Sequence, residues 1–225
     1  MNARLKKLER IAAAQCTEAE PGHDLLHVLR VAENARRIAA AEHADLEVVQ
    51  SAALLHELFN YPKDHPQSHL SGDICADRAA AVLQAEGYAP EITSAICYCI
   101  RYHSFSRGVT PDTLEGKVLQ DADRLDAIGA IGIARCFSTG AEMRRPFYNP
   151  ADPFCQGREP NDKEWTVDHF YRKLLRIPET LHTDTARRLA AERVEFLRLF
   201  LAQMASELGE STGAATGPTG AAPAR

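Results

Sequence analysis

The sequence predicts an all-α protein. Apolar residues recur at intervals near 3.6 along most of the chain, the spacing that places them on one face of a helix. Alternation with a period of two, which is typical of half-buried strands, is not convincing anywhere in the sequence. At 225 residues, 45% of them hydrophobic, the chain suits one domain, or at most two small ones, with a buried core. We therefore expect a single-domain helical bundle.

The first two expected helices each begin after an aspartate. Asp24 is a candidate N-cap for a helix with one apolar stripe, formed by Leu25, Val28, Leu29, Ala32, Ala35 and Ile38. A second helix is expected from Asp45 to about Glu57. Pro62 and Pro66 then enforce an irregular polar loop.

The middle of the chain predicts three long helices and one helix of small residues. The first runs from about residue 71 to 86 and ends before a glycine. The next begins near Pro90 and places His103 on the inward side of its end. The third covers about residues 112–126, and the small residues of 127–137 follow as a helix that can pack closely on its neighbours.

The C-terminal third begins with a proline-rich segment. Residues 139–162 contain four prolines and predict a long ordered loop or lid. Helices are expected over residues 163–177 and 183–208, which complete a domain of residues 1–208. The segment 209–225 has no bulky apolar residue, so we expect it to be disordered.

Composition excludes several classes of partner. With 26 Lys+Arg against 31 Asp+Glu, the net charge of -5 gives no overall attraction to a nucleic-acid polymer or an anionic membrane. The longest apolar stretch, residues 127–134, is far shorter than the roughly 20 residues of a membrane span. Six cysteines without a CxxC pair are typical of free thiols in a reducing compartment. We expect a cytoplasmic protein.

Histidines and acidic residues form the candidate site. His56 and Glu57 close an apolar helix, where a buried carboxylate would need a cation or hydrogen-bond donors. His27 lies beside the apolar stripe of its own helix, and three aspartates occur together as Asp121, Asp123 and Asp126. Taken alone, His56 and Glu57 are also explained by a hydrogen-bonded core histidine beside a solvent-exposed glutamate. The three aspartates alone are also explained by a solvent-exposed helix face. Together they offer four nitrogen and oxygen donors on three helices, which suits a divalent ion.

These residues resemble a known family. His27, His56-Glu57 and the segment Ala122-Asp123-Arg124-Leu125 look like the metal motif of the HD-domain phosphohydrolases, an all-helical superfamily of metal-dependent enzymes. The likeness covers roughly residues 20–205. Within the superfamily, the chain resembles a small bacterial branch that includes a nucleotide pyrophosphohydrolase. Further segments that carry it are GHDLLH at 22–27, HSFS at 103–106, EGK at 115–117, residues 120–132, DHF at 168–170 and KLL at 173–175.

The resemblance implies that His27, His56, Glu57 and Asp123 hold one divalent ion. Mn²⁺ is the first expectation, with Mg²⁺, Fe²⁺, Ni²⁺, Co²⁺ or Zn²⁺ as alternatives. Glu57 departs from the family, whose motif has aspartate at this place. We expect a retained site with shifted geometry, and the alternative is an impaired one.

Further residues are assigned to substrate and catalysis. Positive groups expected to bind the substrate are Lys63, His65, His103, Arg124, His169 and Lys173. Lys63 and His65 can equally belong to an ordinary solvated loop, and Arg124 can equally pair with Asp121 or Asp126. Candidate catalytic residues are Asp121, Asp126 and His103; either aspartate could orient a water molecule or tune a metal ligand. Three further histidines, at 43, 69 and 182, are expected at the surface.

The expected activity is hydrolysis of a small phosphorylated metabolite. By resemblance to the branch, the first expectation is a nucleoside or deoxynucleoside triphosphate cleaved to monophosphate and pyrophosphate. The alternatives are a phosphomonoesterase or phosphodiesterase at the same site, and a non-catalytic module that binds metal or nucleotide because of Glu57. The base preference and the oligomeric state, including a homodimer, are left open by the sequence.

Overall fold

The fold of the described residues consists of helices and loops. The computed structural model describes residues 3–15, 24–61, 65–104 and 107–210, and within these ranges no strand is formed. The α-helices are α1 (Ala3–Gln15), α2 (Leu25–Glu42), α3 (Leu46–Leu55), α4 (Ser71–Ala85), α5 (Pro90–Tyr102), α6 (Leu114–Asp126), α7 (Gly129–Glu142), α8 (Asp168–Arg172) and α9 (Asp184–Leu208). Two 3₁₀ helices, η2 (Ser68–Leu70) and η4 (Leu174–Thr180), complete the set. The all-α prediction is confirmed.

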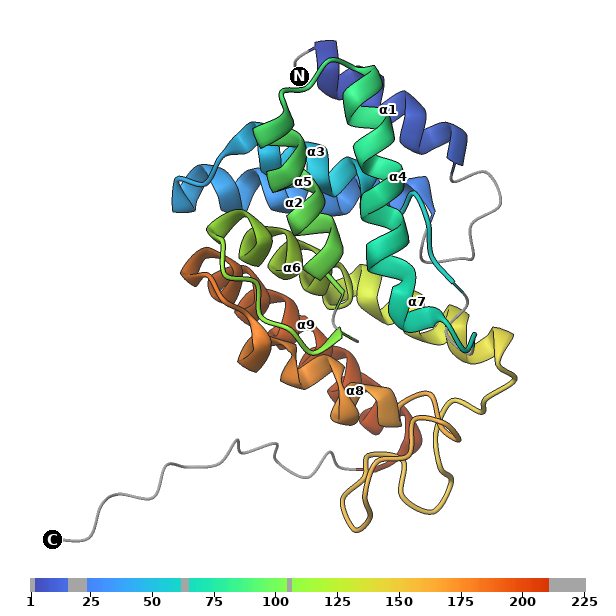
Figure 1. Cartoon of the computed structure of the whole chain (residues 1–225). Coiled ribbons are helices and arrows are strands. Elements are labelled where there is room, and N and C mark those ends of the chain that lie inside the picture. The colour runs from blue at the N-terminus through green and yellow to red at the C-terminus, as the bar shows by residue number, and fades with distance from the viewer. Residues whose placement is uncertain (1–2, 16–23, 62–64, 105–106, 211–225) are drawn as a thin grey trace, which may run out of the picture.

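Helix α2 is central to the bundle. It packs along both α3 and α6, and α4 and α5 form a close pair next to α3. In Figure 1, α1 and the start of α5 lie at one end of the molecule and α8 and α9 at the opposite end. The apolar faces of these helices join in one core cluster, in which Ile38, Leu55, Ile100 and Leu125 are fully buried. The site described below lies where α2, α3 and α6 meet.

Side-chain caps fix where the predicted helices begin. The Asp24 carboxylate accepts a hydrogen bond from the backbone N–H of His27 at 2.9 Å, which starts α2 one turn before that histidine. Asp45 caps α3 in the same way. Thr113 and Thr183 cap α6 and α9. The start of each of these helices follows from local chemistry that the sequence already contains.

The structure corrects three expectations about elements. Helix α1 was not expected, and its buried Leu5, Leu8 and Ala12 attach it to the core. The helix expected over 163–177 is instead the short α8 and the 3₁₀ helix η4, because the backbone leaves helical geometry at Lys173 (φ −133°, ψ −59°). The helix of small residues continues to Glu142, beyond its expected end. The expected disordered tail lies outside the described residues from 211 onward.

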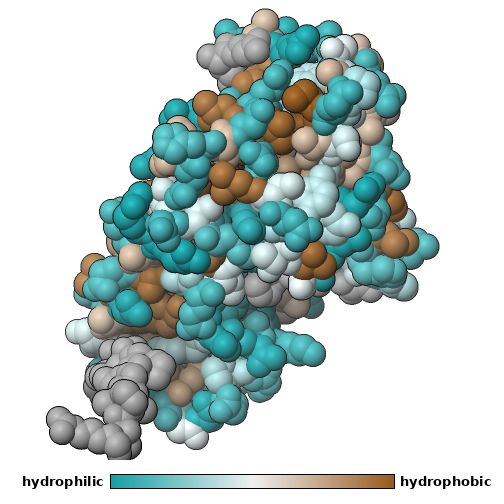
Figure 2. All heavy atoms as spheres, turned by 60° about the vertical axis from the view of Figure 1, so that its left-hand side comes forward, coloured by the Kyte–Doolittle hydropathy of each residue, from teal (hydrophilic) through white to brown (hydrophobic). Residues whose placement is uncertain are grey.

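The surface is largely polar. Figure 2 shows hydrophilic residues over most of the visible face, with apolar residues scattered among them. Within the described ranges, no helix combines the length and the apolar character needed to cross a bilayer.

Candidate metal centre

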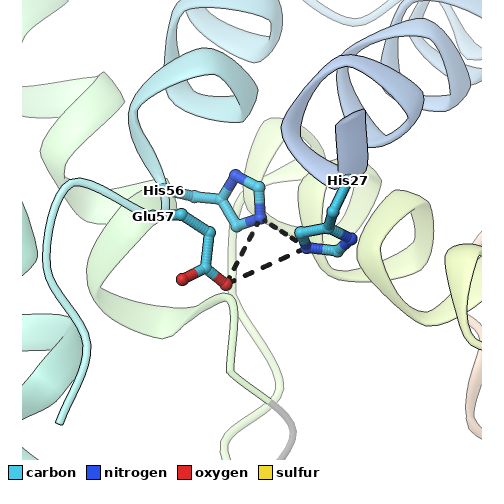
Figure 3. Close-up of side chains that lie close together, drawn as sticks. All are labelled: His27, His56 and Glu57. Atoms are coloured by element: carbon cyan, nitrogen blue, oxygen red, sulfur yellow. Dashed lines mark hydrogen bonds and ion pairs between the residues drawn. The ribbon is translucent and has the colours of Figure 1, made fainter. Parts of the chain in front are cut away.

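Three helices bring the predicted ligands together. His27 lies in the first turn of α2, His56 is the C-cap of α3 with Glu57 directly after it, and Asp123 lies in α6. Figure 3 shows the His27 ring and the Glu57 carboxylate directed toward the His56 ring. Both histidines are almost completely buried, whereas the Asp123 side chain is 26% exposed. The cluster therefore sits at the inner end of an opening in the bundle.

The distances within the cluster are short. The Nε2 atoms of His27 and His56 are 3.3 Å apart, and Glu57 Oε1 lies 3.9 Å from each of them. Asp123 Oδ1 lies 3.5 Å from His27 Nε2. His27, His56 and Glu57 each offer one ligand atom within 4.8 Å of the others.

Hydrogen bonds on the far side of each ring decide which nitrogen faces the cluster as a lone pair. His56 Nδ1 lies 2.7 Å from the carbonyl oxygen of Ala53, which can only accept. His27 Nδ1 lies 2.8 Å from the Asp126 carboxylate, also an acceptor. The donor Arg135 Nη1 is farther from this nitrogen, at 3.4 Å, and is itself directed to the same carboxylate at 2.7 Å. Both protons therefore belong on Nδ1 in the neutral rings, and the two Nε2 lone pairs face each other. Two lone pairs at 3.3 Å with carboxylates beside them need a positive charge between them.

The donor set fits a divalent ion. Two atoms bonded to one ion at about 2.1 Å can be at most about 4.2 Å apart. The three separations among His27, His56 and Glu57, which are 3.3, 3.9 and 3.9 Å, satisfy this limit, and Asp123 satisfies it toward His27 at 3.5 Å. Two imidazoles and two carboxylates are also a mixed set that borderline first-row ions accept.

The protonation states at neutral pH suit metal binding. Burial lowers the pKa of His56 to about 4, so this ring is neutral at pH 7. Burial alone would raise the pKa of Asp123, but the nearby histidines outweigh that effect and hold it at about 2. Burial also acts to raise the pKa of Asp126, but hydrogen bonds from His27 and Arg30 keep it below its usual value.

A cavity of about 820 Å³ opens onto the cluster. His56, Glu57 and Asp123 line it, together with residues of α4, α5, α7 and η4. The basic side chains in its wall are His69, Arg101, His103, Arg107, Arg124, Arg135 and Lys173. Its size falls in the range of about 300–1,000 Å³ that is typical of small-molecule pockets. The combination suits an anionic ligand held against a cation.

Some of the predicted substrate-binding residues reach this cavity and others do not. His103, Arg124 and Lys173 line it. His65 instead stacks on the ring of Tyr61, with the ring centroids 4.3 Å apart. His169 Nδ1 contacts Asp162 Oδ2 at 2.8 Å, and neither His65 nor His169 is among the lining residues of the described chain. Lys63 lies outside the described residues.

The two candidate catalytic aspartates have different surroundings. Asp121 is fully buried, and its carboxylate accepts hydrogen bonds from the backbone N–H groups of His182 and Thr183 and from the Thr183 hydroxyl. It thus joins α6 to the start of α9, and it is not among the residues of the described chain that line the cavity. Asp126 contacts a ligand candidate, His27, rather than the cavity.

Arg124 and two histidines have contacts that the sequence did not predict. Arg124 donates to the carbonyl oxygen of Thr180 and lies 3.3 Å from His182 Nε2. His182 is half-buried and contacts Gln120 Oε1 at 2.6 Å. His69 is exposed as expected but lines the cavity.

Four arginines near the site were missed by sequence reasoning. Arg30 and Arg135 contact the Asp126 carboxylate, and Arg101 and Arg107 line the cavity beside Asp73. Arg30 could have been found, because it follows His27 by three residues on the same helix. Arg101 lies near the end of α5, Arg107 lies in the loop after it, and Arg135 lies in the middle of α7. None of these three sequences carries a local signal for a place near the site.

Comparison with known proteins agrees with the geometry. The family model of the HD domain matches residues 25–128. YpgQ of Bacillus subtilis (strain 168) is 36% identical over 211 residues, which cover 91% of this chain and 95% of YpgQ. The chain belongs to the HD-domain superfamily of metal-dependent phosphohydrolases.

Solved structures of HD proteins share the fold. The crystal structure of B. subtilis YpgQ in complex with ADP matches with a TM-score of 0.71 and 33% identity, over 91% of this chain and 94% of that one. An HD-superfamily hydrolase from Bacillus thuringiensis matches with a TM-score of 0.72 and 28% identity, over 92% of this chain and 97% of that one. As an HD protein, this chain is a metal-dependent hydrolase.

Proposed function

We propose that this protein hydrolyses a nucleoside or deoxynucleoside triphosphate to the monophosphate and pyrophosphate, with Mn²⁺ held by His27, His56, Glu57 and Asp123. The observation that carries the proposal is the opening of this donor cluster onto a cavity with a basic wall. The complex of the relative YpgQ with ADP supports a nucleotide as the ligand. The free cysteines of the described residues support a reducing compartment, the cytoplasm.

Some residues of the site would hold the ion, and others would contact the substrate. When bound, a divalent ion supplies Lewis acidity toward phosphate oxygens and lowers the pKa of water toward neutrality. Arg124 and Lys173 lie in the cavity wall, where their charges balance those of the phosphates. His103 uses Nδ1 toward the carbonyl oxygen of Ile100 at 2.6 Å, so Nε2 is the nitrogen that can exchange a proton with substrate or water.

The test is product analysis with metal-stripped protein that is reloaded with Mn²⁺. We expect monophosphate and pyrophosphate in equal amounts from a panel of ribonucleoside and deoxynucleoside triphosphates. Orthophosphate from a monophosphate ester, or a ring-opened monophosphate from a cyclic nucleotide, would favour the alternative reactions. A flat panel from protein shown to contain the metal would contradict an enzymatic role for these substrates.

Matched variants link the activity to the site. His56→Ala and Asp123→Ala remove one donor each, and we expect both to abolish turnover. His43→Asn is the control, because His43 is an exposed residue at the C-terminus of α2 in left-handed geometry (φ 59°), which asparagine tolerates. Equal loss of activity in all three variants would contradict the assignment.

A further inference from the structure

One buried carboxylate connects three helices behind the metal centre. Asp126, only 2% exposed, ends α6 and contacts two residues of α2 and one of α7. Its Oδ2 atom lies 2.8 Å from His27 Nδ1 and 2.7 Å from Arg135 Nη1. Arg30 reaches both oxygens, with Nε 2.7 Å from Oδ1 and Nη2 3.0 Å from Oδ2.

These contacts fix the orientation of the carboxylate. The two arginines approach it as charged donors from different helices, so rotation of the Asp126 side chain would break at least one ion pair. The lone pair left toward His27 therefore has a defined position. An imidazole that donates its Nδ1 proton there presents its Nε2 lone pair to His56 and Glu57. Figure 3 shows this side of the His27 ring directed toward both residues.

We propose that Asp126, held by Arg30 and Arg135, is a positioning residue that keeps His27 in the Nδ1–H tautomer and thereby sets the metal affinity of the site. The inference rests on the proposed metal centre. The supporting contact joins His27 to Asp126, which lies 99 residues later in the sequence. A carboxylate behind a histidine ligand orients the ring and raises its basicity, and losing such a partner typically weakens metal binding by about 10- to 100-fold. His56 differs, because its Nδ1 proton goes to a backbone carbonyl of its own helix, which no side-chain substitution removes.

The test combines two measurements on Asp126→Ala and Asp126→Asn. Long-range ¹H–¹⁵N NMR of metal-free protein reports which nitrogen of His27 carries the proton, and titration calorimetry with Mn²⁺ reports affinity. We expect the wild type to show the Nδ1–H tautomer. Asp126→Ala should populate the Nε2–H tautomer and bind Mn²⁺ about 10- to 100-fold more weakly. Asp126→Asn, which keeps an oxygen acceptor without its charge, should fall between the two.

Asp121→Asn is the matched control. Asp121 is a buried aspartate of the same helix, but its carboxylate serves the start of α9. We expect this variant to lose stability while its Mn²⁺ affinity and the His27 tautomer stay at the wild-type values. If Asp126→Ala does not fold, Arg135→Gln removes one of the two arginines that contact Asp126. This variant should shift the His27 tautomer and the Mn²⁺ affinity in the same direction by a smaller amount.

The outcomes separate this inference from the proposed function. Wild-type affinity and an unchanged Nδ1–H tautomer in Asp126→Ala, or in Arg135→Gln where that variant stands in, would overturn the positioning role. Absence of Mn²⁺ binding by the wild type would instead contradict the proposed metal centre. The tautomer comparison still decides the role of Asp126 in that case, because it needs no metal.

Discussion

Glu57 is the residue at which this chain departs from the family motif. Its side chain is one methylene longer than aspartate, yet Oε1 lies 3.9 Å from the Nε2 atoms of both histidines. The side chain is only 7% exposed, so it is directed into the cluster rather than into solvent. The longer side chain therefore reaches the position that a ligand needs.

We expect Glu57→Gln to bind Mn²⁺ more than about 100-fold more weakly, because it loses a charged ligand rather than a partner of one. Glu57→Asp should keep measurable turnover, since its carboxylate remains on the same side of the cluster. Calorimetry and the nucleotide assay measure the two effects. Turnover by Glu57→Asp from an inactive wild type would contradict this interpretation and favour a non-catalytic module.

Individual residues of the site were predictable to different degrees. The four ligand candidates follow from motif and spacing; the structure groups His27, His56 and Glu57 and places Asp123 3.5 Å from His27. Residues Asp123 and Asp126 are three apart on α6 and so about 60° apart around its axis, whereas Asp121 is about 160° from Asp123. The helical angle alone therefore places Asp121 on a different face of α6 from Asp123 and Asp126. The role of Arg135 depends on how α7 docks, which no local pattern in the sequence encodes.

At the scale of elements, the contact between α4 and α5 forms one wall of the cavity. Gly72, in the first turn of α4, lies against the end of α5: an added Cβ would be 2.6 Å from the carbonyl oxygen of Arg101. A backbone atom cannot move aside as the end of a side chain can. The two helices would have to separate.

We therefore expect Gly72→Ala to lower the free energy of unfolding by about 1–3 kcal/mol, as overpacked sites do. Urea denaturation measures the change. Gly157→Ala is the control, because its added Cβ would lie 3.9 Å from Asp152 Oδ2, an ordinary contact distance, and we expect a change within about 0.5 kcal/mol. Equal stability of both variants would show that α4 and α5 pack less closely than described.

The sequence predicted elements well where caps and apolar stripes agree. Helices α2 and α3 begin after the expected aspartates. The prediction of one helix over 163–177 failed because no glycine or proline marks the break at Lys173. Helix α1 had a usable signal, since its buried residues have helical spacing, but its strongly basic start obscured that pattern.

At the scale of the whole molecule, the core encloses three cysteines, Cys75, Cys99 and Cys136. Burial raises the pKa values of Cys75, Cys99 and Cys136 to about 12. At pH 8 such a thiol is ionised in only about one molecule in ten thousand, and the thiolate is the reactive form. We expect iodoacetamide at pH 8 to modify these three residues only after unfolding in guanidinium chloride, as followed by mass spectrometry. Rapid modification of the native protein at any of them would contradict the packing of the core.

The central claim is that residues of α2, α3 and α6 hold one divalent ion. The most direct measurement is anomalous diffraction at the manganese absorption edge from crystals grown with Mn²⁺. We predict one strong peak within about 2.0–2.3 Å of donor atoms from His27, His56, Glu57 and Asp123. Manganese bound elsewhere, with these four side chains free of it, would contradict the account.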